Sequence, residues 1–179
     1  MPLTCLAFFI LAVSMINFFA NRASKKDKER AATFWERENK ANSTRKKDLS
    51  SLPYITLDDS LFPFSVEETE ALRSAREQVF AMKGRKILNL NGLSNTDLKL
   101  TYGAANLPAL TQYEENFFAL CAALQNWGEA LSEAGYISEA IQVLQYAQLI
   151  GSDLSSTRTL LTTLCRANQA SDDTQISFK

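Results

Sequence analysis

The chain has 179 residues, with 19 Lys or Arg and 20 Asp or Glu, which gives a net charge of −1. It has no histidine and only three cysteines, none in a Cys-x-x-Cys pair, so we expect no metal and no cofactor. After residue 50 the chain holds nine basic and fifteen acidic side chains, and such an acidic domain argues against a nucleic-acid partner.

Residues 1–20 are predicted to be a transmembrane anchor. Pro2 to Ala20 carries no charged side chain, and at about 1.5 Å rise per residue this segment spans about 28 Å, the hydrocarbon thickness of a bilayer. No basic residue precedes it, and Ala20-Asn21-Arg22 is a poor cleavage site, so an uncleaved anchor is favoured. A cleaved signal peptide and a buried core helix remain the alternatives.

Residues 21–48 form a basic juxtamembrane segment, with ten Lys or Arg up to residue 50 against five Asp or Glu. Because basic flanks stay in the cytoplasm, we expect a single-pass plasma-membrane protein with its N-terminus outside and its C-terminal domain cytoplasmic. The segment lacks Gly and Pro and has no continuous apolar stripe, which favours a solvated helix or tether. Phe34 and Trp35 are the exception, and their default place is on the chain's own domain; the membrane surface and a partner helix are the alternatives.

Residues 49–64, LSSLPYITLDDSLFPF, are predicted to be extended, because Pro53 and Pro63 exclude a helix. The segment is too apolar for a free linker. We expect it to lie on the helical domain; the alternative is a recognition segment for another protein.

Residues 65–168 are predicted to form an α-helical domain, followed by a polar tail at 169–179. Ser65 with Glu68, and Ser94 with Asp97, have the spacing of helix-capping boxes, and Asn106 is placed to cap a third helix. Helical periodicity and glycine stops predict helices over 66–83, 94–103, 109–134, 138–150 and 154–167. The fold class is therefore all-α: an N-terminal transmembrane helix followed by a small helical domain.

Within this domain, residues 121–154, CAALQNWGEALSEAGYISEAIQVLQYAQLIGSDL, resemble a single tetratricopeptide repeat, a hairpin of two antiparallel helices. The resemblance implies packing roles for five residues: Trp127, Gly128, Gly135, Ala140 and Ala147. It also implies a peptide-facing surface on the first helix, formed by Ala122, Gln125, Glu129, Ser132 and Glu133. The alternative is that these five are simply solvated helix positions. Ser152 stands where the family usually has proline, and Tyr136 sits one place earlier than the family's aromatic residue.

Two further stretches, FWERENKANSTRKKDLSSLPYI and DLKLTYGAANLPAL, resemble single-pass membrane proteins of anaerobic Gram-positive bacteria. That resemblance implies no activity. A lone repeat cannot bury both of its faces, so the helix at 66–83 and the extended segment, or a second subunit, must complete the core.

No histidine base is present, the adjacent acidic pairs do not form dyads on a helix, and no Walker, GxGxxG, GxSxG or HExxH motif occurs, so we expect no enzyme. Cys121 and Cys165 are expected as buried thiols in a cytoplasmic protein and could form a disulfide in an exported one.

The predicted function is a membrane-anchored, non-enzymatic helical module for protein–protein interaction, an adaptor or scaffold at the cytoplasmic face. The alternative is a structural subunit of a membrane complex or a self-associating helical protein. A small enzyme or ligand sensor is a third hypothesis that the sequence does not encourage.

Overall fold

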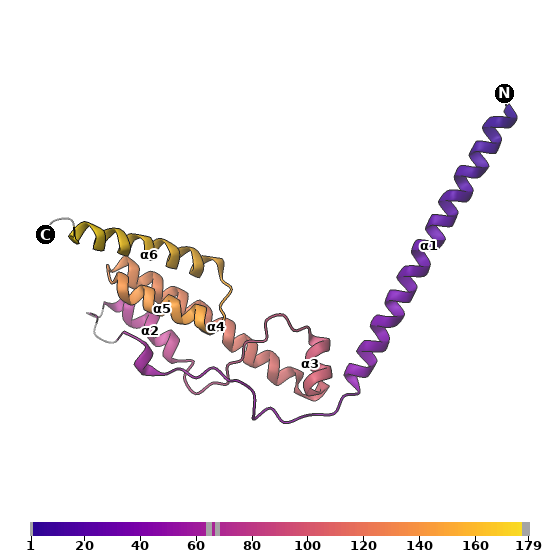
Figure 1. Ribbon diagram of the computed structural model, residues 1–179. Helices are drawn as coiled ribbons and strands as arrows, with labels where there is room; N and C mark the ends of the chain where they lie inside the picture. Colours follow the sequence, from indigo (N-terminus) through magenta and orange to yellow (C-terminus); the bar gives the residue numbers. More distant parts are fainter. Residues whose placement is uncertain (1, 64–65, 67–68, 177–179) are drawn as a thin grey trace. The chain divides into compact units, whose positions relative to one another are not determined.

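The computed structural model describes residues 2–63, 66 and 69–176, and the side chains of these residues except 2–12, 16–21, 23, 24 and 170–176. Throughout the described residues the regular structure is helical, with α-helices, short 3-10 helices and no strand (Figure 1). The all-α class predicted from the sequence is therefore confirmed. The chain divides into two compact units: unit 1 is residues 1–47 with 94–107, and unit 2 is residues 48–93 with 108–179.

Unit 1 contains α1 (Pro2–Asn42), α3 (Asn95–Tyr102) and the 3-10 helix η2 (Ala104–Asn106). α1 is one uninterrupted helix, so the helix expected in the basic segment runs on from the apolar segment and ends at Asn42. Among the described residues, no helix is both long enough and apolar enough to cross a membrane. The structure does not describe the side chains of most residues in the predicted anchor, residues 1–20.

α3 packs on the C-terminal part of α1. Ala41 of α1 and Leu98 of α3 are both almost fully buried, so the contact has an apolar centre. The Arg37 guanidinium donates to the Asp97 carboxylate at 2.5 Å, and Lys99 pairs with Glu38. α3 begins with the capping box predicted from the sequence, in which Ser94 and Asp97 satisfy each other's backbone N–H groups.

The segment that follows α1 is held against the end of α3. The Asn106 side-chain amide donates to the carbonyls of Lys47 and Tyr102, both at 2.7 Å. We expected Asn106 to cap the next helix, but it is buried and ties two backbone segments together instead. Gly103 has φ +93°, and a Cβ there would overlap the Arg45 carbonyl, so this close approach requires glycine.

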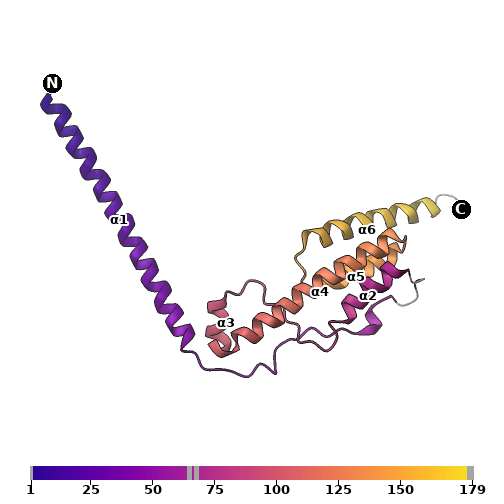
Figure 2. The same ribbon diagram turned by 180° about the vertical axis from the view of Figure 1, so that it is seen from behind.

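Unit 2 is built from α2 (Glu70–Phe80), α4 (Leu107–Glu133, from Pro108 on), α5 (Ile137–Leu149) and α6 (Ser155–Ile176). The four helices lie side by side in both views (Figures 1 and 2). α4 and α5 form the expected helical hairpin and match the predicted bounds within two residues. Gly135, at φ +86°, makes the turn between them.

Two helices of unit 2 differ from the expected bounds. α2 begins later, because the Thr69 side chain accepts from the backbone N–H of Leu72 and caps the helix there, and it ends at Phe80. The expected capping pair, Ser65 and Glu68, lies outside the described residues. α6 continues to Ile176, although we expected the helix to end near residue 167.

The extended segment before α2 packs on the helices of unit 2; we call residues 52–63 the strap. The Phe62 ring is buried, with its centroid 5.5 Å from the Trp127 ring and 5.0 Å from the Tyr146 ring. The Ile55 N–H donates to the Ile87 carbonyl at 2.9 Å. The strap also contains the 3-10 helix η1 (Asp59–Leu61). It therefore completes the core that the α4–α5 hairpin cannot close alone.

Candidate interaction surfaces

The five residues predicted to face a peptide do not form one open surface. Ala122, Glu129 and Glu133 of α4 are exposed, and Ser132 is half-buried. Gln125 is only 6 % exposed, because α6 lies over it. A peptide could therefore reach the outer positions but not Gln125, and the prediction for that residue is corrected.

Gln125 takes part in a polar contact between α4 and α6. The Thr157 hydroxyl donates to the Gln125 side-chain oxygen at 2.5 Å, and the Gln125 amide donates to the Glu129 carboxylate, also at 2.5 Å. Thr157 is 1 % exposed. The buried polar side chains of Gln125 and Thr157 thus both have hydrogen-bond partners, which is the condition for burying them without a large cost. The position thus orients α6 on α4.

Of the five predicted packing residues, four are buried in unit 2, whereas Gly135 is exposed in the α4–α5 turn. Ala140 and Ala147 are fully buried, and Trp127 is 1 % exposed. A Cβ at Gly128 would lie 2.6 Å from a methyl carbon of Leu144, so the absence of a side chain permits this approach. Leu144 of α5 therefore packs directly against Gly128.

A basic groove borders the strap in unit 2. It has a volume of about 290 Å³ and is lined by residues 54–57 and 82–87. The Lys86 ammonium lies 5.3 Å from the Tyr54 ring centroid and 5.6 Å from that of Tyr113, within reach of cation–π attraction. Lys83 pairs with Asp59 at 2.7 Å. Two basic side chains of the groove, Lys83 and Lys86, therefore already contact residues of the strap.

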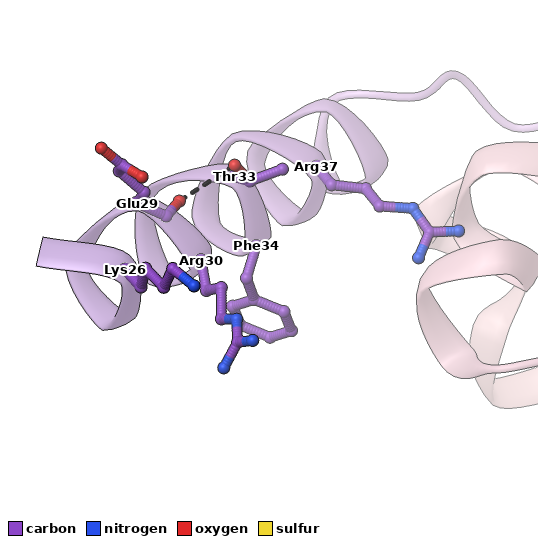
Figure 3. A pocket seen from close by; sticks show the side chains of 6 residues that line it. All are labelled: Lys26, Glu29, Arg30, Thr33, Phe34 and Arg37. Carbon is purple, nitrogen blue, oxygen red and sulfur yellow. Dashed lines mark hydrogen bonds between the residues drawn. The ribbon is translucent and has the colours of Figure 1, made fainter. Parts of the chain in front are cut away.

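The surface of α1 shown in Figure 3 combines an aromatic ring with basic side chains. It is lined by Lys26, Glu29, Arg30, Thr33, Phe34 and Arg37, and the Thr33 hydroxyl donates to the Glu29 carbonyl at 2.9 Å. In Figure 3 the Phe34 ring lies beside the Arg30 guanidinium, and Arg37 reaches away toward a neighbouring helix. The Arg37 guanidinium forms its ion pair there with Asp97 of α3.

Sequence reasoning treated these basic residues only as a flank of the anchor. The pairing of Arg37 and Glu38 of α1 with α3 was missed, because the contact joins positions about sixty residues apart. The pattern that could have indicated an organised face is the spacing of Arg30 and Phe34, and of Arg37 and Ala41, each pair four residues apart.

The two cysteines whose side chains are described are free thiols, Cys121 buried and Cys165 half-buried. Burial raises the pKa of the Cys121 thiol, which disfavours the reactive thiolate. Across the described residues, no three His, Cys, Asp or Glu side chains gather as metal ligands would.

Comparisons with models of known protein families, with curated proteins and with solved structures found no match. The candidate surfaces therefore rest on their geometry and chemistry alone.

Proposed function

We propose that the chain is a membrane-anchored helical module for protein–protein interaction, held at the cytoplasmic face of the plasma membrane, and that it is not an enzyme. The observation that carries this proposal is the continuity of α1 from Pro2 to Asn42. Its first half is the uncharged segment, and its second half is exposed, basic and bound at its end to α3.

The tether would act by confining the domain near its partners. Ala41 lies 21 residues after Ala20, or about 32 Å along a helix axis. A module held at that distance from a bilayer meets membrane-bound partners at a raised effective concentration. The tetratricopeptide resemblance of the α4–α5 hairpin supports the same function. In this proposal the outer residues of α4, including Ala122, Glu129 and Glu133, form a contact surface for a partner.

Alkaline extraction of membranes tests the anchor. The full chain should stay in the membrane pellet after carbonate washing, whereas a chain that lacks residues 1–20 should be released to the supernatant. Release of the full chain would contradict the proposal.

The alternative is a self-associating structural subunit, and one observation favours it: Leu149 of α5 is 80 % exposed and Phe118 of α4 is 49 % exposed. In a self-associating subunit these side chains would be covered by the neighbouring copy, which would remove their apolar surface from water. The mass of the detergent-solubilised full chain, measured by light scattering, separates the two: a monomer supports the module, and a stable dimer supports the subunit.

A further inference from the structure

Phe34 and Trp35 are large aromatic side chains in the middle of a charged helix, and both are exposed. Phe34 is 56 % and Trp35 is 60 % exposed, and their rings contact each other edge to face with centroids 5.5 Å apart. The two rings thus form one exposed apolar patch rimmed by polar residues, and such patches mark interaction sites.

Phe34 lies on the same face of α1 that binds α3. Arg37 pairs with Asp97, and Ala41, four residues later, is fully buried. Arg30 and Phe34 repeat this cation-then-apolar pair seven residues earlier. Seven residues fall only about 20° short of two full turns, so both pairs share one face. The arrangement that α3 uses is thus present a second time, two turns nearer the N-terminus.

The charge around Phe34 indicates what would bind there. Lys26, Arg30 and Arg37 line the surface with one acid, Glu29 (Figure 3). Two exposed pairs lie beside it, Glu29 with Lys25 at 4.0 Å and Asp27 with Arg30 at 3.8 Å, and such exposed pairs leave the face basic because they are weak. α3 meets the equivalent pair with Asp97 followed directly by the buried Leu98. A ligand of matching chemistry has an acid next to a large apolar side chain on one face of a helix.

We propose that Lys26, Arg30 and Phe34, here called the Phe34 surface, bind an acidic amphipathic helix of a partner protein, in the way that Arg37 and Ala41 bind α3. This inference extends the proposed interaction module by assigning its contact surface and the chemistry of its partner.

The distance from the bilayer favours a protein over lipid. Phe34 lies 14 residues after Ala20, or about 21 Å along the axis, and about 16 Å from the hydrocarbon edge even at a 40° tilt. The headgroup layer is only about 5–7 Å thick on each side. The Phe34 surface therefore lies beyond the headgroups and level with membrane-proximal helices of other proteins.

The test measures binding of a defined probe to the detergent-solubilised full chain. The probe is a fluorescein-labelled helical peptide about three heptads long, with a Glu-Leu pair in each heptad on an alanine background. An analogue with Lys in place of Glu serves as the control ligand. Arg30→Glu and Phe34→Ala should each weaken binding of the acidic peptide about tenfold or more, and the Lys analogue should not bind.

Matched variants separate the surface from general charge and from folding. Lys28→Glu makes the same charge change about 200° around the helix, and Leu149→Ala removes an exposed apolar side chain in unit 2; both should change the affinity less than about twofold. Equal losses in Lys28→Glu and Arg30→Glu, or no loss in Arg30→Glu and Phe34→Ala, would overturn the proposal. So would a lower melting temperature of Phe34→Ala, because that result would show that the chain's own fold covers the surface.

Contact with lipid is tested in nanodiscs that contain brominated phospholipid. If the brominated lipid quenches the fluorescence of the parent protein but not that of Trp35→Phe, this face of α1 lies in the bilayer. That result would overturn the assignment to a protein helix. Binding in detergent does not require membrane insertion, so failure of the Phe34 surface and failure of the anchor give distinguishable results.

Discussion

At the scale of single residues, Asp97 joins three interactions at the start of α3. Its carboxylate accepts from the Ser94 N–H at 3.1 Å and from the Ser94 hydroxyl, and it pairs with Arg37 of α1. One side chain thus caps α3 and attaches it to α1. The hydrogen bonds from Ser94, which are the largest cause, hold the pKa of the Asp97 carboxyl below its usual value, and the Arg37 charge adds to them.

A lowered folded-state pKa gives a pH dependence of known sign. Asp97 should stabilise the α1–α3 contact at every pH above the ordinary carboxyl value of about 3.9, and this contribution should fade as the pH falls through the lowered value. NMR titration of the Asp97 side-chain carboxyl measures this pKa directly. In Ser94→Ala the pKa should move back toward the ordinary value, and titration of the parent protein at that ordinary value would refute the assigned role.

Gly128 gives a second prediction at this scale. Because Leu144 would lie 2.6 Å from any Cβ at position 128, Gly128→Leu should overfill the α4–α5 contact and lower the free energy of unfolding by about 1–3 kcal/mol or more. Urea unfolding of the full chain in detergent measures the loss.

Gly135→Ala is the comparison variant, because no atom lies within 4 Å of a Cβ there and only the positive φ is unfavourable. It should cost about 1 kcal/mol. Equal stability of Gly128→Leu and the parent protein would show that the two helices do not meet at this point.

At the scale of elements, the sequence predicts those parts of the fold that local patterns determine. The α4–α5 hairpin follows from its apolar periodicity and Gly135, and the α3 cap follows from Ser94 and Asp97. The absence of an α-helix in the strap follows from its prolines. These features depend on residues near one another in the chain, which periodicity and capping rules describe well.

Contacts between distant segments were not predictable in the same way. Nothing in the charges of Arg37 or Glu38 shows that α3 will be their partner, so α3 and η2 were expected in the 65–168 domain rather than with α1. The repeat resemblance placed Gln125 on the outer surface of α4, and its contact with Thr157 of α6 explains why it is buried instead. The sequence singled out Phe34 and Trp35 and placed them by default on the chain's own domain, whereas both rings are exposed in the structure.

The strap gives a prediction at the element scale. Phe62 packs against Phe80, Trp127 and Tyr146, so Phe62→Ala should lower the free energy of unfolding by about 3–5 kcal/mol. Its neighbour Leu61 is 43 % exposed, and Leu61→Ala should cost less than about 1 kcal/mol. Thermal unfolding of both variants measures the difference, and equal melting temperatures would mean that the strap does not stabilise the helices.

At the scale of the whole molecule, the chain combines a long N-terminal helix that carries α3 with a helical unit closed by the strap and α6. The proposed function follows if the uncharged start of α1 is in a membrane and its basic continuation is on the cytoplasmic side. The anchor would then keep the Phe34 surface and the outer positions of α4 close to membrane-bound partners.

Labelling of a single new cysteine in cells tests this central claim most directly. Ser43 is exposed just after α1, so Ser43→Cys is a suitable reporter in a chain that also carries Cys5→Ser and Cys165→Ser, with the buried Cys121 left in place. The account predicts that the protein stays in the membrane fraction and that a membrane-impermeant maleimide labels Ser43→Cys only after the cells are permeabilised. Labelling of intact cells, or recovery of the protein outside the membrane fraction, would contradict it.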